Sequence, residues 1–521
     1  MYTVLARTPG EFKQLVLPPL ARSLKSILRL QCVMPLLTFY GGVGEIGGNL
    51  ISLRNREEGC HVLFDAGLSF SAYRRFFDFP FRIPQESVRL ELVETEILPE
   101  IVGLHDRPIR YYAELAKAKG KGKEEGGYEI IEPADEETDI DEVFVSHVHS
   151  DHSKLCSLLG SRSTIRMGEL TTDLFVKNAG LSSRMDLFSK LFFQDAKSGR
   201  ARHRYQPFAD GERVELGGFE ILPLAVDHST PSSFGFLITC STGTMAYTGD
   251  IRFHGAAGRL SREFIHEARE RDVDVLVTEG TNMGESRPQG ESDVGKFSSA
   301  LIEKSNRGGN HLTLVKVSPA DIDRISSMVS LAEELDNEVI LTKGVASTIC
   351  IASSFRERLR FIKLPDLKKC RILVPKDTTY ADRHSKFLER EGLADLFLKL
   401  SDYHSECSGK PHVIISRGDL NLFKLKPLPR SLYIFSTSEP VNEEEEFNLE
   451  REINTAQLLG LLFYHVHASG HASSLDLVEM VKQIKPKKLI PIHTENPNAF
   501  GKIFSDYADV VVPQKGKPLE I

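Results

Sequence analysis

The sequence predicts a layered α/β protein in which a β-rich unit is interrupted by a second unit of alternating strands and helices. From residue 36, short apolar segments such as LLTFYGGVGEIGGNLISL and HVLFDAGLSF end in glycine turns, as the strands of stacked sheets do. The pattern changes after residue 285, where 311–317 is predicted as a strand, 319–334 as an amphipathic helix and 338–344 as a second strand. This βαβ pattern indicates a parallel sheet, and the β-rich character returns beyond residue 432.

These changes predict four segments along the chain. Residues 1–33 form a basic amphipathic extension to which we assign no chemistry, and residues 34–285 form the first part of the β-rich unit. The inserted α/β unit is expected over 286–435, and the β-rich unit resumes over 436–521. Beyond residue 432, the apolar segments 433–435, 463–467 and 488–493 are predicted as strands, with a helix at 475–484.

Composition excludes several classes of protein. With 521 residues, 41% of them hydrophobic and 26% charged, the chain can bury a large core and is neither disordered nor fibrous. Its seven cysteines contain no CxxC pair, which argues against a disulfide framework and favours a reducing cytoplasm. The chain contains no run of eighteen apolar residues, so no membrane span is predicted. The net charge of −8 means that any nucleic acid would need a local basic groove.

The strongest chemical signal is the segment DEVFVSHVHSDHSKL, in which a strand ending at Val145 leads into four metal-competent side chains. These are His147, His149, Asp151 and His152. Residues two apart in an extended segment project to the same side, so His147 and His149 can approach one ion, and the other two face a second. The alternative is a hydrogen-bonded surface histidine group, although polar residues crowded after a buried strand need compensation.

Two later positions extend this pattern to a binuclear site. His228 follows an apolar strand expected at 219–226, and Asp250 follows another at 243–247. Either residue alone would more often be a turn residue. Imidazole and carboxylate groups in this order suit two neighbouring zinc ions, which can share a hydroxide of lowered pKa.

The order HxHxDH, a later histidine, then TGD resembles the metallo-β-lactamase superfamily of hydrolases, which implies an αββα sandwich. The late segments HVHASGHAS (465–473) and KPKKLIPIHTE (485–495) look like the closing motifs of its β-CASP nuclease branch, in which an α/β domain is inserted into the sandwich. The opening TFYGGVGEIGGN is similar to that of ribonuclease J and its archaeal relatives.

The resemblance implies roles for individual residues. His147, His149 and His228 would bind one zinc, and Asp151, His152 and His493 the other, with Asp250 bridging both and Mn²⁺ as an alternative metal. Asp151 and His471 would be catalytic, with His471 acting on the leaving group or the scissile phosphate. Glu279 and Glu495 would support the ligands, and His467 would bind phosphate. Independently of the resemblance, the backbone amides of Ser469 and Gly470 in a turn could form a small anion nest for phosphate.

The predicted function is that of a zinc-dependent ribonuclease that uses a metal-bridged hydroxide, digests RNA from the 5′ end and optionally cuts internally. RNA is favoured over DNA because the resembled RNA-processing members keep the histidine at the position of His493. We expect a cytoplasmic protein with no membrane association and with a homodimer as an option. Two alternatives stay open, namely a hydrolase of small esters or thioesters and a catalytically silent RNA-binding subunit.

RNA is expected to lie in a cleft between the two units. Two basic clusters are the candidates for its phosphate contacts, although each could also be a solvated face. They consist of Arg200, Arg202, Arg204, Arg356, Arg358 and Arg360.

Overall fold

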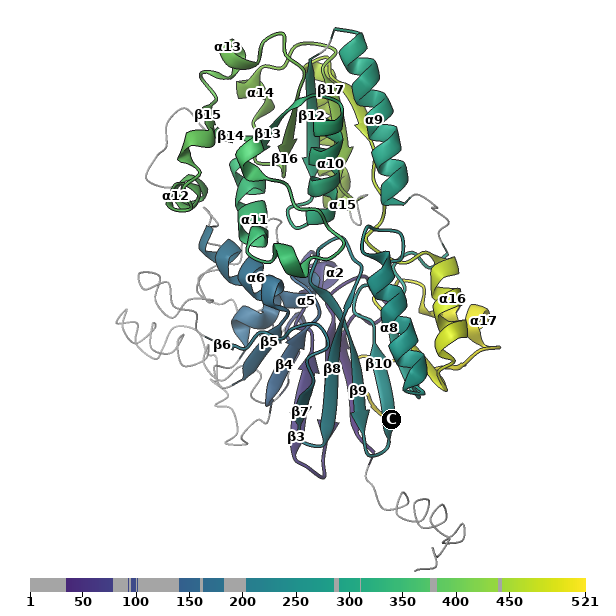
Figure 1. Cartoon of the computed structure of the whole chain (residues 1–521). Helices are drawn as coiled ribbons and strands as arrows, with labels where there is room; N and C mark the ends of the chain where they lie inside the picture. Colours follow the sequence, from purple (N-terminus) through teal and green to yellow (C-terminus); the bar gives the residue numbers. More distant parts are fainter. Residues whose placement is uncertain are drawn as a thin grey trace, which may run out of the picture.

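The computed structural model describes residues 34–77, 92, 95–99, 101, 140–159, 163–181, 203–284, 290–309, 311–374, 382–438 and 443–521. Within these residues the strands form three sheets of seven strands each. Two sheets stack as a sandwich, and the third forms a separate layered unit above them in Figure 1. The predicted fold class, a sandwich with an additional α/β unit, is therefore confirmed.

The two sheets of the sandwich are mixed. The first has the order β21-β1-β2-β3-β4-β5-β6 and the second the order β20-β19-β11-β10-β9-β8-β7. The strands of the first sheet are β1 (Leu36–Gly41), β2 (Leu50–Asn55), β3 (Cys60–Phe64), β4 (Glu142–Val145), β5 (Thr164–Met167), β6 (Arg204–Tyr205) and β21 (Pro518–Glu520). Those of the second are β7 (Val214–Leu216), β8 (Phe219–Val226), β9 (Ser233–Cys240), β10 (Gly243–Tyr247), β11 (Val275–Glu279), β19 (Lys488–Ile492) and β20 (Asp509–Val510).

An aromatic core fills the space between these two sheets. The rings of Phe64 and Phe236 lie 5.3 Å apart between centroids, and Phe144 and Tyr247 pack beside them. Helices cover both outer faces, which gives four layers. These helices are α2 (Phe70–Tyr73), α5 (Ser150–Ser153) and α6 (Glu169–Leu181) on the first sheet, and α8 (Gly258–Glu270), α16 (Ser474–Ile484) and α17 (Pro497–Phe504) on the second.

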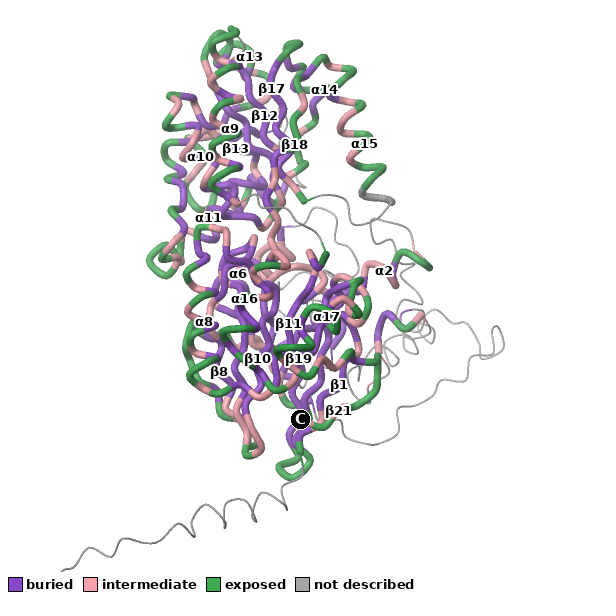
Figure 2. The backbone as a smooth tube through the Cα atoms, turned by 90° about the vertical axis from the view of Figure 1, so that its right-hand side faces the viewer, coloured by how far each residue is buried: buried purple, intermediate pink, exposed green. Residues whose placement is uncertain are grey.

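The third sheet is parallel throughout, with the order β15-β14-β13-β16-β12-β17-β18. Its strands are β12 (Leu312–Val317), β13 (Glu338–Thr342), β14 (Arg371–Val374), β15 (Phe397–Lys399), β16 (His412–Ser416), β17 (Leu432–Ser436) and β18 (Leu462–His465). Its helices are α9 (Glu291–Arg307), α10 (Ile322–Glu334), α11 (Lys343–Ser353), α12 (Arg383–Arg390), α13 (Tyr403–Cys407), α14 (Leu422–Leu425) and α15 (Glu443–Leu458). Helices α9 to α12 pack on one face, and α13 to α15 on the other, so both faces are buried as a parallel sheet requires. Figure 2 shows the buried strands at the centre of both units.

The two units share a core. Leu170, Leu174 and Leu181 of α6, a sandwich helix, are buried in the same apolar cluster as α10 and α11. Val148, which lies between two candidate metal ligands, also packs against this cluster. The third unit is therefore seated on the edge of the sandwich that carries the candidate ligands.

One strand belongs to a different sheet from the one we predicted. We assigned the strand near 463–467 to the resumed sandwich, but β18 pairs with β17 in the third sheet, with Leu462 opposite Leu432. A short apolar segment predicts a strand but not its neighbour, because pairing is decided by long-range contacts. The predicted domain boundaries at 285 and 435 stay predictions.

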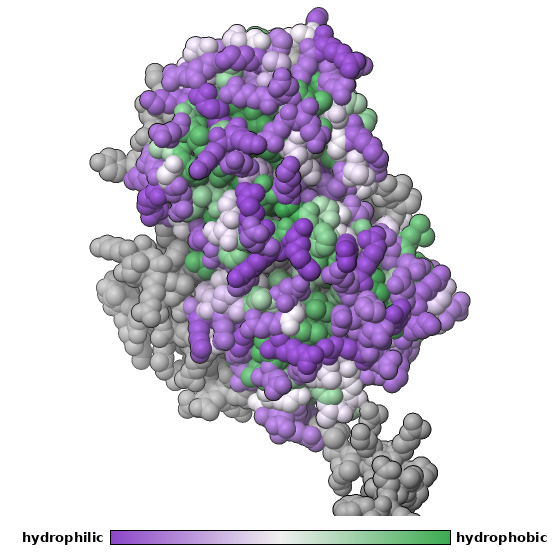
Figure 3. All heavy atoms as spheres, viewed as in Figure 1, coloured by the Kyte–Doolittle hydropathy of each residue, from purple (hydrophilic) through white to green (hydrophobic). Residues whose placement is uncertain are grey.

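The surface gives two further observations. Figure 3 shows mainly hydrophilic side chains on the face that Figure 1 presents, with smaller apolar areas between them. Across the described part of the chain, no helix combines the length and apolar character needed to cross a bilayer.

Candidate metal centre

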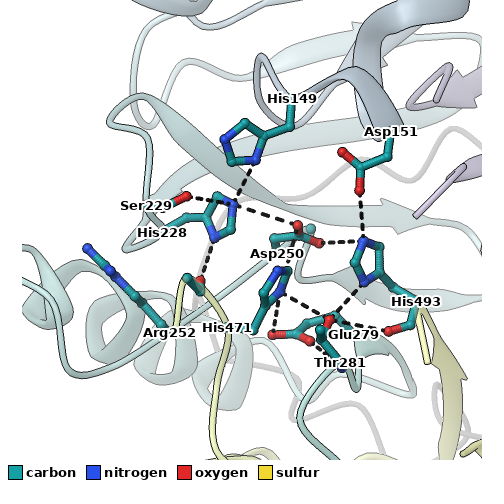
Figure 4. A network of polar contacts seen from close by, with 12 residues as sticks. His149, Asp151, His228, Ser229, Asp250, Arg252, Glu279, Thr281, His471 and His493 are labelled. Atoms are coloured by element: carbon teal, nitrogen blue, oxygen red, sulfur yellow. Dashed lines mark hydrogen bonds and ion pairs between the residues drawn. The ribbon is translucent and has the colours of Figure 1, made fainter. Parts of the chain in front are cut away.

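The candidate ligands lie where strands end. His147 and His149 follow β4, His228 follows β8, Asp250 follows β10, and His493 follows β19. Strands β10, β11 and β19 are parallel neighbours, so their carboxyl ends meet at one edge of the second sheet. The segment after β4 meets them from the first sheet, because Phe234 donates its amide proton to the Ser146 carbonyl at 3.0 Å. Residues from four distant segments therefore meet at one edge of the sandwich (Figure 4).

The first group of candidate ligands is His147, His149, His228 and Asp250, whose ligand atoms all lie within 4.8 Å of one another. His149 Nδ1 lies 3.1 Å from both His147 Nε2 and His228 Nε2. Asp250 Oδ2 is 3.6 Å from His147 Nε2 and 3.7 Å from His228 Nε2. Three imidazole nitrogens and a carboxylate oxygen thus surround one point.

The second group is Asp151, His152 and His493, again with ligand atoms within 4.8 Å of one another. Asp151 Oδ2 lies 3.3 Å from His493 Nε2 and 3.8 Å from His152 Nε2. Asp250 faces this group as well, with Oδ2 3.2 Å from His152 Nε2 and Oδ1 3.8 Å from His493 Nε2. The structure therefore brings together all seven predicted ligands, with Asp250 between the two groups.

Two buried atoms indicate that this donor set is suited to a cation. His152 Nε2 and Asp250 Oδ1 have no hydrogen-bond partner among the described residues, although both side chains are almost fully buried. Unsatisfied buried polar atoms are costly, and imidazole nitrogen with carboxylate oxygen is the set that zinc prefers. A cation bound among these residues would satisfy both atoms.

The electrostatics of the cluster point the same way. Burial lowers the pKa of His147 and of His228 well below the usual range, and lowers that of His149, so these rings are neutral and have a free lone pair. Burial also opposes charge on His152, but Asp250 and Asp65 outweigh it and raise the pKa of His152 well above its usual value. The carboxylates that attract a proton to this ring would equally attract a metal ion, which would replace that proton.

Asp65 holds His152 from behind, and sequence reasoning missed it. Its Oδ2 accepts a hydrogen bond from His152 Nδ1 at 2.8 Å and one from the Tyr247 hydroxyl, while its Oδ1 accepts from the Ser146 amide at 2.7 Å. Asp65 has a positive φ of 60°, which is uncommon for a residue other than glycine. The sequence feature that could have identified Asp65 is its position in FDAG, because it is a polar residue directly after the buried strand β3.

The glycine-rich segment after β1 passes directly beside the second group. The amide of His493, whose φ is 51°, donates to the carbonyl of Gly42 at 2.8 Å. A Cβ atom on Gly47 would lie 2.7 Å from the Asp151 carboxylate, so only glycine permits this close approach. The motif GGVGEIGG therefore has a structural role at the candidate metal centre.

Glu279 and Thr281 anchor two of the site histidines. Glu279 accepts from the amides of Ala472 at 3.1 Å and Thr281 at 2.8 Å, and lies 3.5 Å from His471 Nδ1. The hydroxyl of Thr281 is 2.8 Å from His493 Nδ1 and 3.1 Å from His471 Nδ1. Glu279 thus contacts His471 rather than one of the seven predicted ligands, and Thr281, which contacts the predicted ligand His493, was missed although it stands in the same EGTN segment.

His471 lies at the open side of the cluster. Its side chain is 19% exposed, whereas those of His147, His152, His228 and His493 are at most 1% exposed. Burial opposes its charge, but Glu279 and Asp250 raise its pKa to about 9. Its Nδ1 also forms a third metal-competent group with Asp250 and His493.

The segment predicted to bind phosphate lies beside the site, but with its carbonyls turned toward neighbouring side chains. The Gly470 carbonyl lies 2.5 Å from His228 Nδ1, and the Ser469 carbonyl lies 2.8 Å from His254 Nε2. The Ser469 hydroxyl accepts from Asn282 at 3.0 Å. His467 Nδ1 is buried without a hydrogen-bond partner among the described residues.

Glu495 does not support the ligands, contrary to our prediction. It is exposed and makes no hydrogen bond or ion pair with any residue that the structure describes. The chain bends at His493 into the left-handed region and buries Thr494, so the next residue lies on the surface. Two residues adjacent in a motif need not share a site.

The predicted RNA-binding arginines have varied surroundings. Arg200 and Arg202 lie outside the described residues, and Arg204 is exposed. Arg356 donates to the carbonyls of Leu364 at 2.6 Å and Pro365 at 2.8 Å. Arg358 pairs with Glu169, and Arg360 lies 3.4 Å from Asp210, so these two arginines link the third unit to the sandwich. Their role in RNA binding stays a prediction.

An αββα sandwich with histidines and aspartates gathered at one sheet edge is typical of metallo-hydrolases of the β-lactamase superfamily. The comparisons agree: residues 128–304 match the family described as "Beta-lactamase superfamily domain". Residues 462–500 match the "Zn-dependent metallo-hydrolase RNA specificity domain". The predicted resemblance to this superfamily of hydrolases and to its β-CASP branch is therefore confirmed.

Several curated relatives are ribonucleases J. That of Mycoplasma genitalium is 25% identical over 291 residues, which cover 55% of this chain and 48% of the relative. Ribonuclease J 2 of Streptococcus pyogenes is 25% identical over 68% of this chain and 59% of the relative. Ribonuclease J of Helicobacter pylori is 22% identical over 88% of this chain and 56% of the relative. The chain thus spans about half to three fifths of the length of these relatives.

A solved structure shows the same fold. A crystal structure of a protein of unknown function from Enterococcus faecalis superimposes with a TM-score of 0.69 at 20% identity. The superposition covers 94% of this chain and all of the other.

Proposed function

We propose that this chain is a metal-dependent ribonuclease that hydrolyses phosphodiester bonds of RNA. The observation that carries the proposal is the meeting of seven histidine and aspartate ligands at one edge of the sandwich, next to the third unit. The match to an RNA specificity domain and the similarity to ribonucleases J support RNA as the substrate. A 5′-to-3′ direction with optional internal cleavage is part of the proposal.

The residues present fit two divalent cations. His147, His149 and His228 would hold one, Asp151, His152 and His493 the other, and Asp250 would be shared. Zinc is our first choice and Mn²⁺ the alternative. When bound, such ions neutralise charge on phosphoryl oxygens and lower the pKa of water.

The chain itself must bind the scissile phosphate and protonate the leaving oxygen. We assign both tasks to His471, because its side chain is more exposed than those of the four buried histidine ligands and stands directly beside Asp250. Glu279 and Thr281 would orient its ring through the contacts at 3.5 and 3.1 Å. His467, Ser469 and Gly470 would complete the phosphate subsite.

The proposal extends to the position of the RNA, the location of the protein and its oligomeric state. RNA would lie between the sandwich and the third unit, with DNA as the weaker candidate. The cytoplasm is the proposed location, supported by described cysteines that are free thiols. A homodimer is the oligomeric state that we would test first.

The test is digestion of a short RNA labelled at either end, with matched DNA alongside. A 5′-to-3′ exonuclease releases the 5′ label at once as a mononucleotide, while the 3′ label stays on a shortening fragment. Asp151→Ala should lower turnover by several orders of magnitude. Asp173→Ala is the matched control, because among the described residues this aspartate pairs only with Lys177. Wild-type turnover in folded Asp151→Ala would refute the metal-dependent mechanism.

Two alternatives make different predictions for the same protein. A hydrolase of small esters or thioesters would turn over such substrates and leave RNA intact, and the third unit seated beside the site argues against it. A silent RNA-binding subunit would bind RNA without bound metal or cleavage. The presence of all seven ligands argues against a catalytically silent subunit. Elemental analysis of the purified protein distinguishes a metal-containing enzyme from a metal-free subunit.

A further inference from the structure

A buried ion cluster joins the sandwich to the third unit directly behind the candidate metal centre. Its centre is formed by Arg252 and Arg324, whose side chains are fully buried. Arg252 stands two residues after Asp250, and Arg324 lies in the first turn of α10. Neither arginine is among the predicted ligands, and sequence reasoning did not single them out.

Arg252 binds three carboxylates from both units. Its Nε donates to Asp227 Oδ1 at 3.2 Å, its Nη1 to Glu291 Oε1 at 3.0 Å and its Nη2 to Asp323 Oδ2 at 2.8 Å. Its backbone amide also donates to the Asp227 carbonyl at 2.8 Å. Asp227 precedes the candidate ligand His228, and Arg252 follows the candidate ligand Asp250 by two residues, so the contact between them joins these two ligand segments.

Glu291, at the start of α9, couples the two arginines. It accepts from Arg324 through both oxygens, at 2.8 Å from Nε and 2.7 Å from Nη2, while Oε1 also accepts from Arg252. Bidentate arginine–carboxylate pairs fix orientation as well as distance. The remaining nitrogen of Arg324, Nη1, donates to the hydroxyl of Ser436 at the end of β17.

Both arginines reach the segment 466–471, which carries His471. The Ser436 hydroxyl donates to the Val466 carbonyl at 2.6 Å, so Arg324 is linked to the beginning of this segment. Arg252 Nη1 lies 3.5 Å from the Ser469 carbonyl, and the next carbonyl, of Gly470, is bonded to His228. The segment is thereby fixed at two points, one from each unit.

We propose that Arg252, Glu291 and Arg324 are positioning residues that hold the segment 466–471, and with it His471, against the candidate metal centre. Buried ion clusters add little net stability compared with apolar packing, because desolvation offsets their attraction. The contacts of this cluster instead fix the positions of α9, α10 and β17 relative to the ligand segment that follows β10. The role of the segment in cleavage rests on the proposed ribonuclease function.

The test uses the full-length, metal-loaded protein with three variants. Arg252→Lys keeps the charge but cannot reach three carboxylates and a carbonyl together. Ser436→Ala removes only the link from Arg324 to Val466, so it serves if the arginine variant does not fold. The matched control is Arg166→Lys, because Arg166 makes a similar two-bond pair with Glu142 in the first sheet.

Two readouts decide the proposal in folded variants. We expect the amides of 466–471 to exchange hydrogen about tenfold faster than in the wild type and the control. We expect kcat on RNA to fall about 10- to 100-fold, more than KM rises, with the metal content unchanged.

Unchanged exchange in either folded variant, or faster exchange with wild-type kcat, would overturn the positioning role. A merely stabilising cluster would lower the melting temperature without changing kcat of the folded protein. If the wild-type protein leaves RNA intact, the proposed function fails, and hydrogen exchange alone then decides whether these residues position the segment.

Discussion

Asp65→Asn is the sharpest test of how the second group of ligands is held. Asp65 is buried and accepts four hydrogen bonds, from the Ser146 amide at 2.7 Å, the Ser146 hydroxyl at 3.0 Å, His152 Nδ1 at 2.8 Å and the Tyr247 hydroxyl. An asparagine has one oxygen and one NH₂ group in their place. If the oxygen stays with the Ser146 amide, the NH₂ group faces His152 Nδ1.

The consequence is a change of tautomer in His152. Its Nδ1 would become an acceptor and its Nε2 would carry the proton, yet Nε2 is the atom that points to Asp250 at 3.2 Å. A protonated Nε2 cannot bind metal. Loss of such a supporting carboxylate typically costs about 10- to 100-fold in metal affinity, and the disturbed hydrogen bonds should cost about 1–3 kcal/mol of folding stability.

The assay is a competition titration of each variant with a zinc chelator, after circular dichroism has confirmed folding. Tyr247→Phe is the matched control, because it removes one bond to the same carboxylate and leaves the His152 tautomer unchanged, so metal affinity should fall less than about threefold. Wild-type zinc affinity in folded Asp65→Asn would refute the reasoning.

Three further predictions concern other parts of the molecule. His471→Ala should retain its metal content in elemental analysis yet cleave RNA slowly, whereas loss of an ion would make His471 a ligand. Burial, with Arg417 adding to it, lowers the pKa of His384 to about 4, so only the unfolded chain gains this proton as pH falls below 6.5. Stability should therefore fall from about pH 6.5 toward 4, and His384→Gln should flatten that fall in urea unfolding. Charge reversal of the clusters around Arg204 and Arg358 should lower the salt dependence of RNA binding by about one unit of log-log slope or less per lost contact, and unchanged slopes in both would contradict the cleft.

Local patterns in the sequence were enough to predict much of the fold and of the candidate site. The helix predicted at 475–484 is α16, and the βαβ pattern from 311 is β12, α10 and β13. The ligand segment 147–152 was evident because its side chains are neighbours in sequence and follow a buried strand. His228, Asp250 and His493 were found through their order and resemblance rather than through any contact.

The tertiary structure decided which distant residues meet, and this information is absent from any short segment. Asp65 supports His152 across 87 positions, and Arg252 reaches Ser469 across 217. Glu495 shows the converse, since it is adjacent to the site in sequence but exposed. Periodicity and turn residues act over a few positions, so the sequence by itself determined the elements and the chemistry at their ends. Sheet membership, hydrogen-bond partners and the seat of the third unit depend on packing between segments far apart in the chain, and only the folded structure determines them.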